Sequence, residues 1–272
     1  MKALPALLAL FFLTPAVAGD RVIWPIDDFP PAYIVSGEFA GTGIGDQEIR
    51  YLTERLGEFA NETLQVSNSR AWAMLAEQDG VCIAGAYETP ERRKIAAYSR
   101  VALTILGPQI LIRSDEAERF QKFQNAAGEI DLDRLGAASE LRAARPAGRP
   151  LGNTMEEFAR AHAIPTLPVS HQALSMLDSG RLDYSLGYAN ELTYYRKTHP
   201  GSGRLTALKV AGLPRIIYLH VACSARAVGR RVVARVDEIL GPHGAPPYFQ
   251  SPARRWYDNK DFQDLASLAR WP

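Results

Sequence analysis

Short apolar runs alternate with segments of helical periodicity in the first third of the chain. Three runs, each bounded by Gly, Pro or Asp, read as buried strands: residues 21–26, 64–66 and 80–86. Ile49, Leu52 and Leu56 recur at helical spacing after Asp46, a suitable cap. Helices are therefore expected at residues 46–57 and 71–78. The order strand, helix, strand, helix, strand predicts an α/β fold with a mostly parallel sheet covered by helices.

The alternation continues to the C-terminus. Thr89, Pro90 and Glu91 supply an N-cap, a proline at the first helical position and an acid in the first turn, so a short helix is expected here. An apolar run covers residues 101–112, and Thr154 is expected to begin a helix in a second lobe. The other expected elements are helices at 170–180, 191–197, 229–240 and 252–271, and strands at 182–188 and 217–223.

The N-terminal residues predict a secretory signal peptide. Lys2 gives a positive start, an almost wholly apolar stretch follows from Leu4 to Leu13, and Ala16 and Ala18 place small residues where a signal peptidase cleaves. Cleavage after Ala18 makes 1–18 the signal peptide and predicts a periplasmic protein. A retained anchor is the alternative, but the stretch is short of the roughly 20 apolar residues that span a bilayer.

Composition excludes several classes of function. The 31 basic and 30 acidic residues leave a net charge of +1, which gives no electrostatic footprint for nucleic acid. The 5 histidines have no metal-ligand spacing, and the sequence contains no Walker loop, no Gly-x-Ser-x-Gly and no dinucleotide-binding glycine motif. We therefore expect no metal, no cofactor and no enzymatic activity, and we expect a monomer.

The only two cysteines, Cys82 and Cys223, both remain after cleavage and enter an oxidising compartment. Two cysteines cannot form a CxxC-type metal site. They either bond to each other or remain two buried thiols packed as small hydrophobic residues.

Four short motifs, in order, give the chain a family resemblance. They are Asp28-Phe29-Pro30-Pro31, the run from Ile83 to Arg92, Gly152-Asn153-Thr154, and the run from Asp178 to Asp183. Each is weak alone, but together over most of the chain they resemble the bacterial extracellular solute-binding proteins of family 3, the polar amino-acid receptors of ABC importers. The closer likeness is to a divergent branch of that family.

The resemblance implies a type 2 periplasmic-binding fold with two α/β lobes and two strand crossings between them. Residues 19–108 plus 214–272 would form lobe 1, and residues 109–213 lobe 2. In this fold the strand that returns to lobe 1 inserts antiparallel beside the third strand. That placement implies a disulfide between Cys82 and Cys223.

The resemblance also implies a site for a carboxylate. Arg92 matches the arginine with which the receptors clamp the ligand carboxylate, and Thr89 and Thr154 begin helices that point into the cleft. Gly85 and Asn153 belong to the same motifs and are included in the predicted site. The alternative for Arg92 is a solvated arginine in a basic run.

Aromatic residues complete the predicted site. Phe29 and Tyr33 match positions that stack on the ligand, although both are also ordinary core candidates, and Tyr87 is expected to narrow the pocket. Tyr188 replaces the aspartate that pairs with a ligand ammonium group. A standard α-amino acid is therefore disfavoured unless Asp28 or Glu191 substitutes for that aspartate.

The predicted function is a periplasmic solute-binding protein that closes on a small carboxylate-bearing, amino-acid-like ligand and delivers it to an ABC permease. One alternative is ligand sensing for a membrane-bound signalling partner. Another is a dehydratase-like enzyme that uses the same cleft.

Overall fold

The computed structural model describes residues 19–147, 150–168, 170–202, 204–241 and 249–270. The predicted signal peptide, residues 1–18, lies outside these residues. Within the described ranges, none of the helices has the length and apolar character needed to cross a membrane.

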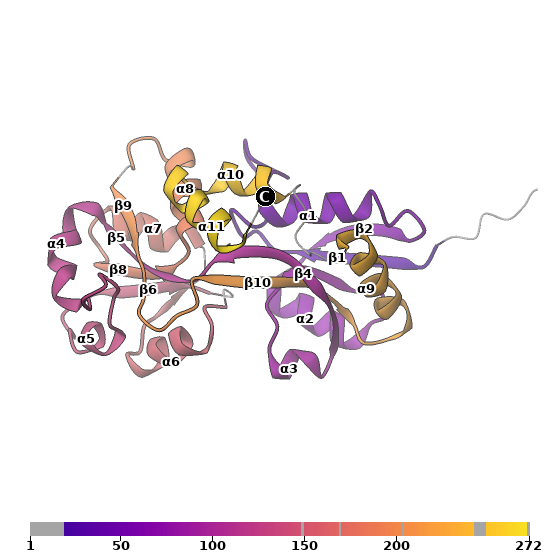
Figure 1. Cartoon of the computed structure of the whole chain (residues 1–272), viewed down its shortest axis with the longest axis horizontal. Coiled ribbons are helices and arrows are strands. Elements are labelled where there is room, and N and C mark those ends of the chain that lie inside the picture. Colours follow the sequence, from indigo (N-terminus) through magenta and orange to yellow (C-terminus); the bar gives the residue numbers. More distant parts are fainter. Residues whose placement is uncertain (1–18, 148–149, 169, 203, 242–248, 271–272) are drawn as a thin grey trace, which may run out of the picture.

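Two groups of strands and helices lie side by side along the long axis of the molecule (Figure 1). The first lobe begins with β1 (Arg21–Ile26), α1 (Ile44–Thr53), β2 (Ala60–Gln65), α2 (Asn68–Glu77), β3 (Cys82–Ala86), α3 (Pro90–Arg93) and β4 (Ala96–Leu106). The second lobe contains β5 (Gln109–Arg113), α4 (Ala117–Phe120), α5 (Leu132–Gly136), β6 (Ala143–Pro146), α6 (Asn153–Ala161), β7 (Thr166–Leu167), α7 (Ser170–Asp178), β8 (Tyr184–Gly187), α8 (Ala189–Thr198) and β9 (Leu205–Leu208). The chain ends with β10 (Ile216–Ser224), α9 (Ala227–Leu240), α10 (Gln250–Trp256) and α11 (Asn259–Leu268).

The first lobe has one parallel and one antiparallel sheet, and the second lobe has one mixed sheet. In the first lobe β1 pairs with β2 in parallel, and a second sheet has the order β3-β10-β4. In the second lobe the order is β7-β6-β8-β5-β9. The α/β fold class is confirmed, and the antiparallel ladders among the described strands all involve β5 or β10, which follow the two crossings between lobes.

The two crossings run side by side. The first passes through Gly107 and Pro108 between β4 and β5, and the second joins β9 to β10. The N–H of Gly107 donates to the carbonyl of Arg215 at 2.9 Å. A Cβ at Gly107 would lie 2.1 Å from the carbonyl oxygen of Pro214, so only glycine fits this close approach. We propose the lobe limits 19–108 plus 214–272 and 109–213, supported by the change of sheet at these crossings.

Several helices begin two or three residues before the expected position, and the helical segment expected at 252–271 is divided into α10 and α11. Two helices also have a different cap from the one expected. α1 begins at Ile44, so Asp46 is its third residue rather than its cap; its Oδ2 accepts the N–H groups of Gly43 at 2.9 Å and Ile34 at 3.0 Å. α6 begins at Asn153 after Gly152, whose φ is 77°, which places Thr154 inside the helix. Gly152 has a positive φ that glycine favours, whereas Gly43 is extended and is needed because a Cβ there would lie 2.4 Å from the carbonyl oxygen of Ala32. A glycine before a helix is a weaker signal in the sequence than a Ser, Thr or Asp.

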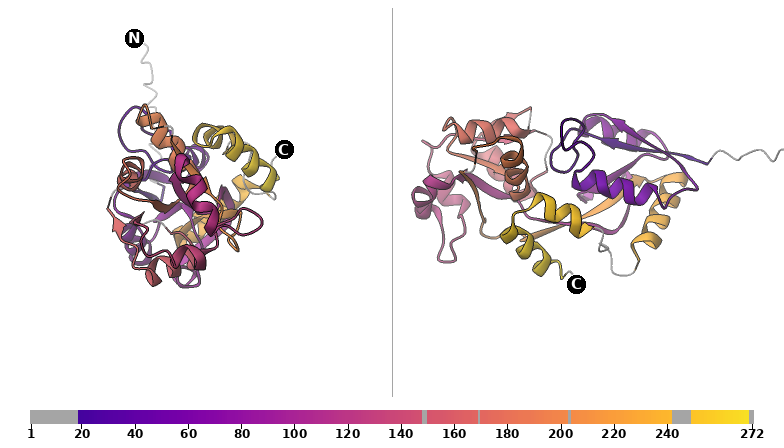
Figure 2. Two further views of the ribbon diagram at one scale, coloured as in Figure 1. Left: turned by 90° about the vertical axis from the view of Figure 1, so that its left-hand side faces the viewer. Right: turned by 90° about the horizontal axis from the view of Figure 1, so that it is seen from above.

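The C-terminal helices α10 and α11 lie over the junction between the lobes (Figures 1 and 2). Trp256 is fully buried there, and its Nε1 donates to the carbonyl of Thr42 at 2.8 Å. Its ring meets Phe39 of the first lobe at 5.4 Å between centroids and Tyr194 of the second lobe at 5.5 Å. Asp264 on α11 pairs with Lys209 of the second crossing at 3.1 Å. The end of the chain thus contacts both lobes.

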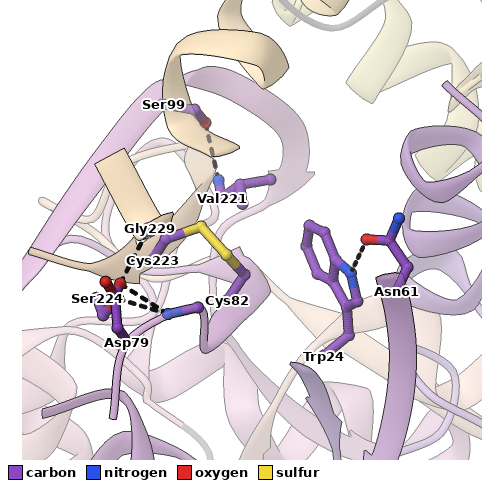
Figure 3. Close-up of a disulfide and its surroundings, with 10 residues drawn as sticks. Trp24, Asn61, Asp79, Cys82, Ser99, Val221, Cys223, Ser224 and Gly229 are labelled. Atoms are coloured by element: carbon purple, nitrogen blue, oxygen red, sulfur yellow. Dashed lines mark hydrogen bonds between the residues drawn. A yellow bond between two sulfur atoms is a disulfide. The ribbon is translucent and has the colours of Figure 1, made fainter. Parts of the chain in front are cut away.

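A disulfide joins Cys82 on β3 to Cys223 on β10, which confirms the predicted pair (Figure 3). The two residues are direct partners in the antiparallel ladder, with Cα atoms 4.0 Å apart. Next to them the Asp79 carboxylate accepts hydrogen bonds from Gly80, Ser224, Val228 and Gly229, and these bonds lower its pKa against the opposing effect of burial. The start of α9 is therefore fixed to the turn just before β3.

Removing the disulfide should destabilise the protein without changing its fold. The bond closes a loop with a sequence separation of 141. Chain entropy alone gives about 4–5 kcal/mol for a loop of this length. Urea unfolding of the exported protein with and without a reductant measures this difference. Two free thiols, found by alkylating the unreduced protein before mass spectrometry, would contradict the pairing.

Candidate ligand-binding site

A cavity of about 160 Å³ lies where the two lobes meet. Its first-lobe wall comes from the loop after β1, from α1 and α2, and from β3, β4 and β10. The second lobe contributes Ala147, Pro150, Tyr188 and Asn190. Most of the lining is apolar, and its large aromatic and aliphatic side chains include Phe29, Tyr33, Trp72, Tyr87, Val66, Ile83, Leu103, Ile105, Ile217 and Leu219. Such a wall binds an apolar body, with the few polar groups left to fix its orientation.

Arg92 brings a positive charge to this apolar wall. Its guanidinium lies over the Trp72 ring, 4.0 Å from the centroid, and one nitrogen donates to the carbonyl of Tyr87 at 3.0 Å. No acidic side chain forms an ion pair with Arg92 in the described part of the chain. Burial lowers the pKa of Arg92, but an arginine stays protonated in proteins. The site therefore presents a half-buried cation that lacks a counter-ion.

The structure brings six of the ten predicted site residues together around the cavity. They are Phe29, Tyr33, Gly85, Tyr87, Arg92 and Tyr188. The other four lie outside its lining. Asp28 is exposed and its carboxylate faces the N–H of Val35 at 3.4 Å, Thr89 caps α3 by accepting the N–H of Arg92 at 3.2 Å, and Asn153 and Thr154 are exposed at the start of α6.

Tyr188 lines the cavity and also holds a neighbouring loop in place through a hydrogen bond. It precedes α8, it is 6% exposed, and its hydroxyl donates to the carbonyl of Pro150 at 2.5 Å. Glu191, considered above as a partner for a ligand ammonium group, is buried behind it and accepts the N–H of Tyr188 at 3.4 Å. Neither Glu191 nor Asp28 contributes to the cavity lining.

Four polar or aromatic lining residues were missed by sequence reasoning: Asp27, Asn68, Trp72 and Asn190. Asp27 accepts the N–H of Asn68 at 3.0 Å and so holds the start of α2 against the end of β1. Asn190 is 5% exposed, and its Oδ1 has no hydrogen-bond partner among the described residues. Trp72 lies on α2, and its contact with the Arg92 guanidinium shows its place in the site. A polar residue directly after a strand end was the available signal for Asp27, whereas Asn190 lies three positions past the end of β8, inside α8.

Glu48 on α1 lies behind this wall with no exposed surface. Tyr33 covers it and donates its hydroxyl proton to the carbonyl of Ala84 at 2.8 Å. A Cβ at Gly45 would lie 2.5 Å from the Tyr33 ring, so α1 needs glycine there. Burial raises the pKa of Glu48 to about 8, opposed by the nearby N–H of Gly85. The carboxyl group is therefore protonated at neutral pH.

Comparison with solved structures identifies the fold. A histidine kinase sensor domain with similarity to periplasmic binding proteins matches with a TM-score of 0.63 and 16% identity, over 89% of this chain and 97% of that one. An amino acid ABC transporter substrate-binding protein from Streptococcus pneumoniae, bound to L-arginine, matches with a TM-score of 0.61 and 16% identity, over 92% and 93%. These matches establish the two-lobed fold of type 2 periplasmic binding proteins.

A third match is the ancestral amino acid-binding protein AncCDT-1, a precursor of cyclohexadienyl dehydratase. Its TM-score is 0.59 at 16% identity, over 92% of this chain and 94% of that one. No protein-family model and no curated protein sequence matches the chain. At these identities the likeness shows the fold, and the function has to be argued from the site.

Glu48 should make stability fall as the pH rises. Between its ordinary pKa of 4.5 and the folded value of about 8, the unfolded chain releases the proton while the folded protein keeps it. The contribution of Glu48 to the free energy of unfolding is thus fully present below pH 4.5 and is lost as the pH rises to about 8. Replacing Glu48 with Gln should therefore raise the stability relative to wild type by roughly 3–4 kcal/mol more at pH 8 than at pH 5. Urea unfolding at both pH values measures this; equal differences would contradict it.

Proposed function

We propose that this protein is a periplasmic solute-binding protein that closes its two lobes on a small carboxylate with an apolar body. The observation that carries the proposal is the half-buried guanidinium of Arg92, which has no ion-pair partner among the described residues, on the wall of a mostly apolar cavity. A desolvated cation costs free energy unless a counter-ion arrives, so the cavity favours an anionic ligand.

A carboxylate suits Arg92 for two reasons. The planar guanidinium can form two parallel hydrogen bonds to the two oxygens of a carboxylate. Stacking on Trp72 and the bond to the Tyr87 carbonyl hold the guanidinium in place before the ligand binds. The Arg92 side chain is therefore already ordered in the folded protein before the ligand binds. This lowers the entropic cost of binding.

The cavity also limits the body of the ligand. About 160 Å³ is the size of a cavity that accepts a single aromatic ring in other proteins, where roughly 150 Å³ binds benzene. Phe29, Trp72 and Tyr87 offer aromatic faces, and Leu103 and Ile217 offer aliphatic contacts. An arylalkanoic or branched aliphatic acid fits this lining better than a strongly polar amino acid.

The fold supports a role in uptake, in which an ABC permease receives the ligand. The similarity to an ABC transporter substrate-binding protein supports this proposal, as does the predicted signal peptide. The similarity to a histidine kinase sensor domain supports the second candidate, sensing for a membrane-bound partner. A permease gene beside the gene for this protein favours uptake, whereas a kinase or cyclase gene favours sensing.

The dehydratase-like alternative has its own test. The support for it is the similarity to a precursor of cyclohexadienyl dehydratase. Incubation of the protein with prephenate, followed by chromatography of the products, distinguishes turnover from simple binding.

Replacing Arg92 with Ala should weaken binding of any carboxylate ligand by about 2–4 kcal/mol, because the ligand anion loses its desolvated partner. Calorimetry with a carboxylate identified by thermal-shift screening measures the change. Arg93→Ala is the matched control, since Arg93 is exposed and pairs with Glu88. An unchanged dissociation constant for Arg92→Ala would show that Arg92 is only a surface charge.

The twenty standard amino acids should stabilise the protein little. Asp27 is the only acidic residue in the described cavity lining, and its Oδ2 already accepts the Asn68 N–H. An α-ammonium group would therefore lose most of its hydration without a dedicated carboxylate. Thermal unfolding with each amino acid tests this expectation. A shift that corresponds to micromolar affinity for a common polar amino acid would refute it.

A further inference from the structure

Glu48 is a buried acid that the proposed carboxylate site does not use. It has no exposed surface, and neither of its carboxyl oxygens accepts a hydrogen bond of normal geometry from the described residues. Buried polar groups in folded proteins are nearly always paired, because an unpaired one costs stability. An unpaired buried acid beside a ligand cavity indicates that a polar group of the ligand forms the missing hydrogen bond.

Gly85 connects this acid to the cavity. Gly85 lines the cavity with a φ of 61°. The atoms nearest to a Cβ at this position, apart from the chain neighbours, are Oε2 of Glu48 at 3.8 Å, Cδ1 of Leu103 at 3.8 Å and Oη of Tyr33 at 3.9 Å. The missing side chain thus leaves a recess with room for one heavy atom, bordered by two oxygens. An atom in it needs to shift by only about 1 Å to reach hydrogen-bond distance of either oxygen.

The recess is polar but carries no charge at neutral pH. The Tyr33 hydroxyl donates to the Ala84 carbonyl, which leaves its own oxygen able to accept. The nearest other acid on α1, Asp46, is held by the N–H groups of Gly43 and Ile34. Glu48 keeps its proton up to about pH 8, so it can both donate and accept. A neutral group that donates and accepts matches this pair of oxygens.

We propose that the recess formed by Gly85, Glu48 and Tyr33 binds a hydroxyl group of the ligand. The site then takes a hydroxylated carboxylic acid with an apolar body, with the carboxylate on Arg92 and the hydroxyl on Glu48. This inference rests on the proposed function, because the Arg92 contact places the ligand in the cavity.

Calorimetry with three matched probes tests the inference. The probes are 3-phenylpropionate, its 2-hydroxy derivative 3-phenyllactate, and its ring-hydroxylated derivative 3-(4-hydroxyphenyl)propionate. At least one hydroxylated probe should bind the wild type about tenfold more tightly than the parent acid, the effect of one net hydrogen bond. Glu48→Gln, which still donates and accepts, should keep most of this gain, and Glu48→Leu should lose it while still binding the parent acid.

The outcomes separate this inference from the proposed function. If the parent acid binds through Arg92 but neither hydroxyl adds affinity, or if the gain survives in Glu48→Leu, the recess is not a hydroxyl site and the carboxylate site stands. If none of the three probes binds the wild type, both the inference and the proposed class of ligand are wrong. The wild-type comparison remains decisive even where a variant fails to fold. L-Phenylalanine serves as a fourth probe. If it binds more tightly than 3-phenyllactate, the recess takes an ammonium group rather than a hydroxyl group, and the inference is wrong.

Discussion

The insertion of β10 between β3 and β4 is the constraint on which the rest of the structure depends. It brings the last fifth of the chain back to the first lobe, and the Cys82–Cys223 bond fixes the register of β10 with β3. Because β10 and β4 pair along their length, the two crossings must leave the first lobe side by side, which is why Gly107 has no room for a side chain. The same three strands contribute Gly85, Leu103 and Ile217 to the cavity wall.

Two carboxylates away from the cavity, one buried and one exposed, are well paired. In the second lobe Asp183 is paired with Arg142 and Arg119, which lower its pKa against the opposing effect of burial, and in the first lobe Asp79 accepts four hydrogen bonds. Around the cavity, Arg92 has no ion-pair partner and Glu48 and Asn190 have unpaired oxygens among the described residues. Folded proteins break the pairing rule chiefly at functional sites. Buried side-chain atoms without a partner also occur away from the cavity among the described residues, such as Oε1 of Gln109 and Nε of Arg145. We propose that those around the cavity are completed by a ligand.

The sequence predicted the elements of the fold well because its strands and helices are marked by periodicity and breakers. β1 has the predicted ends, and the pairing of the cysteines followed from the family resemblance. The positions of α10 and α11 over the lobe junction could not be predicted. Amphipathic periodicity shows that one face of a helix is buried, but it does not show which part of the protein that face packs against. In the site, Arg92 and four of its aromatic residues were predicted from their positions within the family motifs. Asp27 and Asn190 were missed because a single polar residue near a strand end has no periodic signature.

We propose above all that the cavity between the lobes binds a small carboxylate through Arg92. A crystal structure of the protein with the tightest-binding carboxylate tests it most directly. The expected result is a carboxylate within about 3 Å of the Arg92 guanidinium nitrogens, with the apolar body against Trp72 and the lobes closed around it. A ligand bound elsewhere, or one whose carboxylate points to solvent while Arg92 stays unpaired, would contradict the claim.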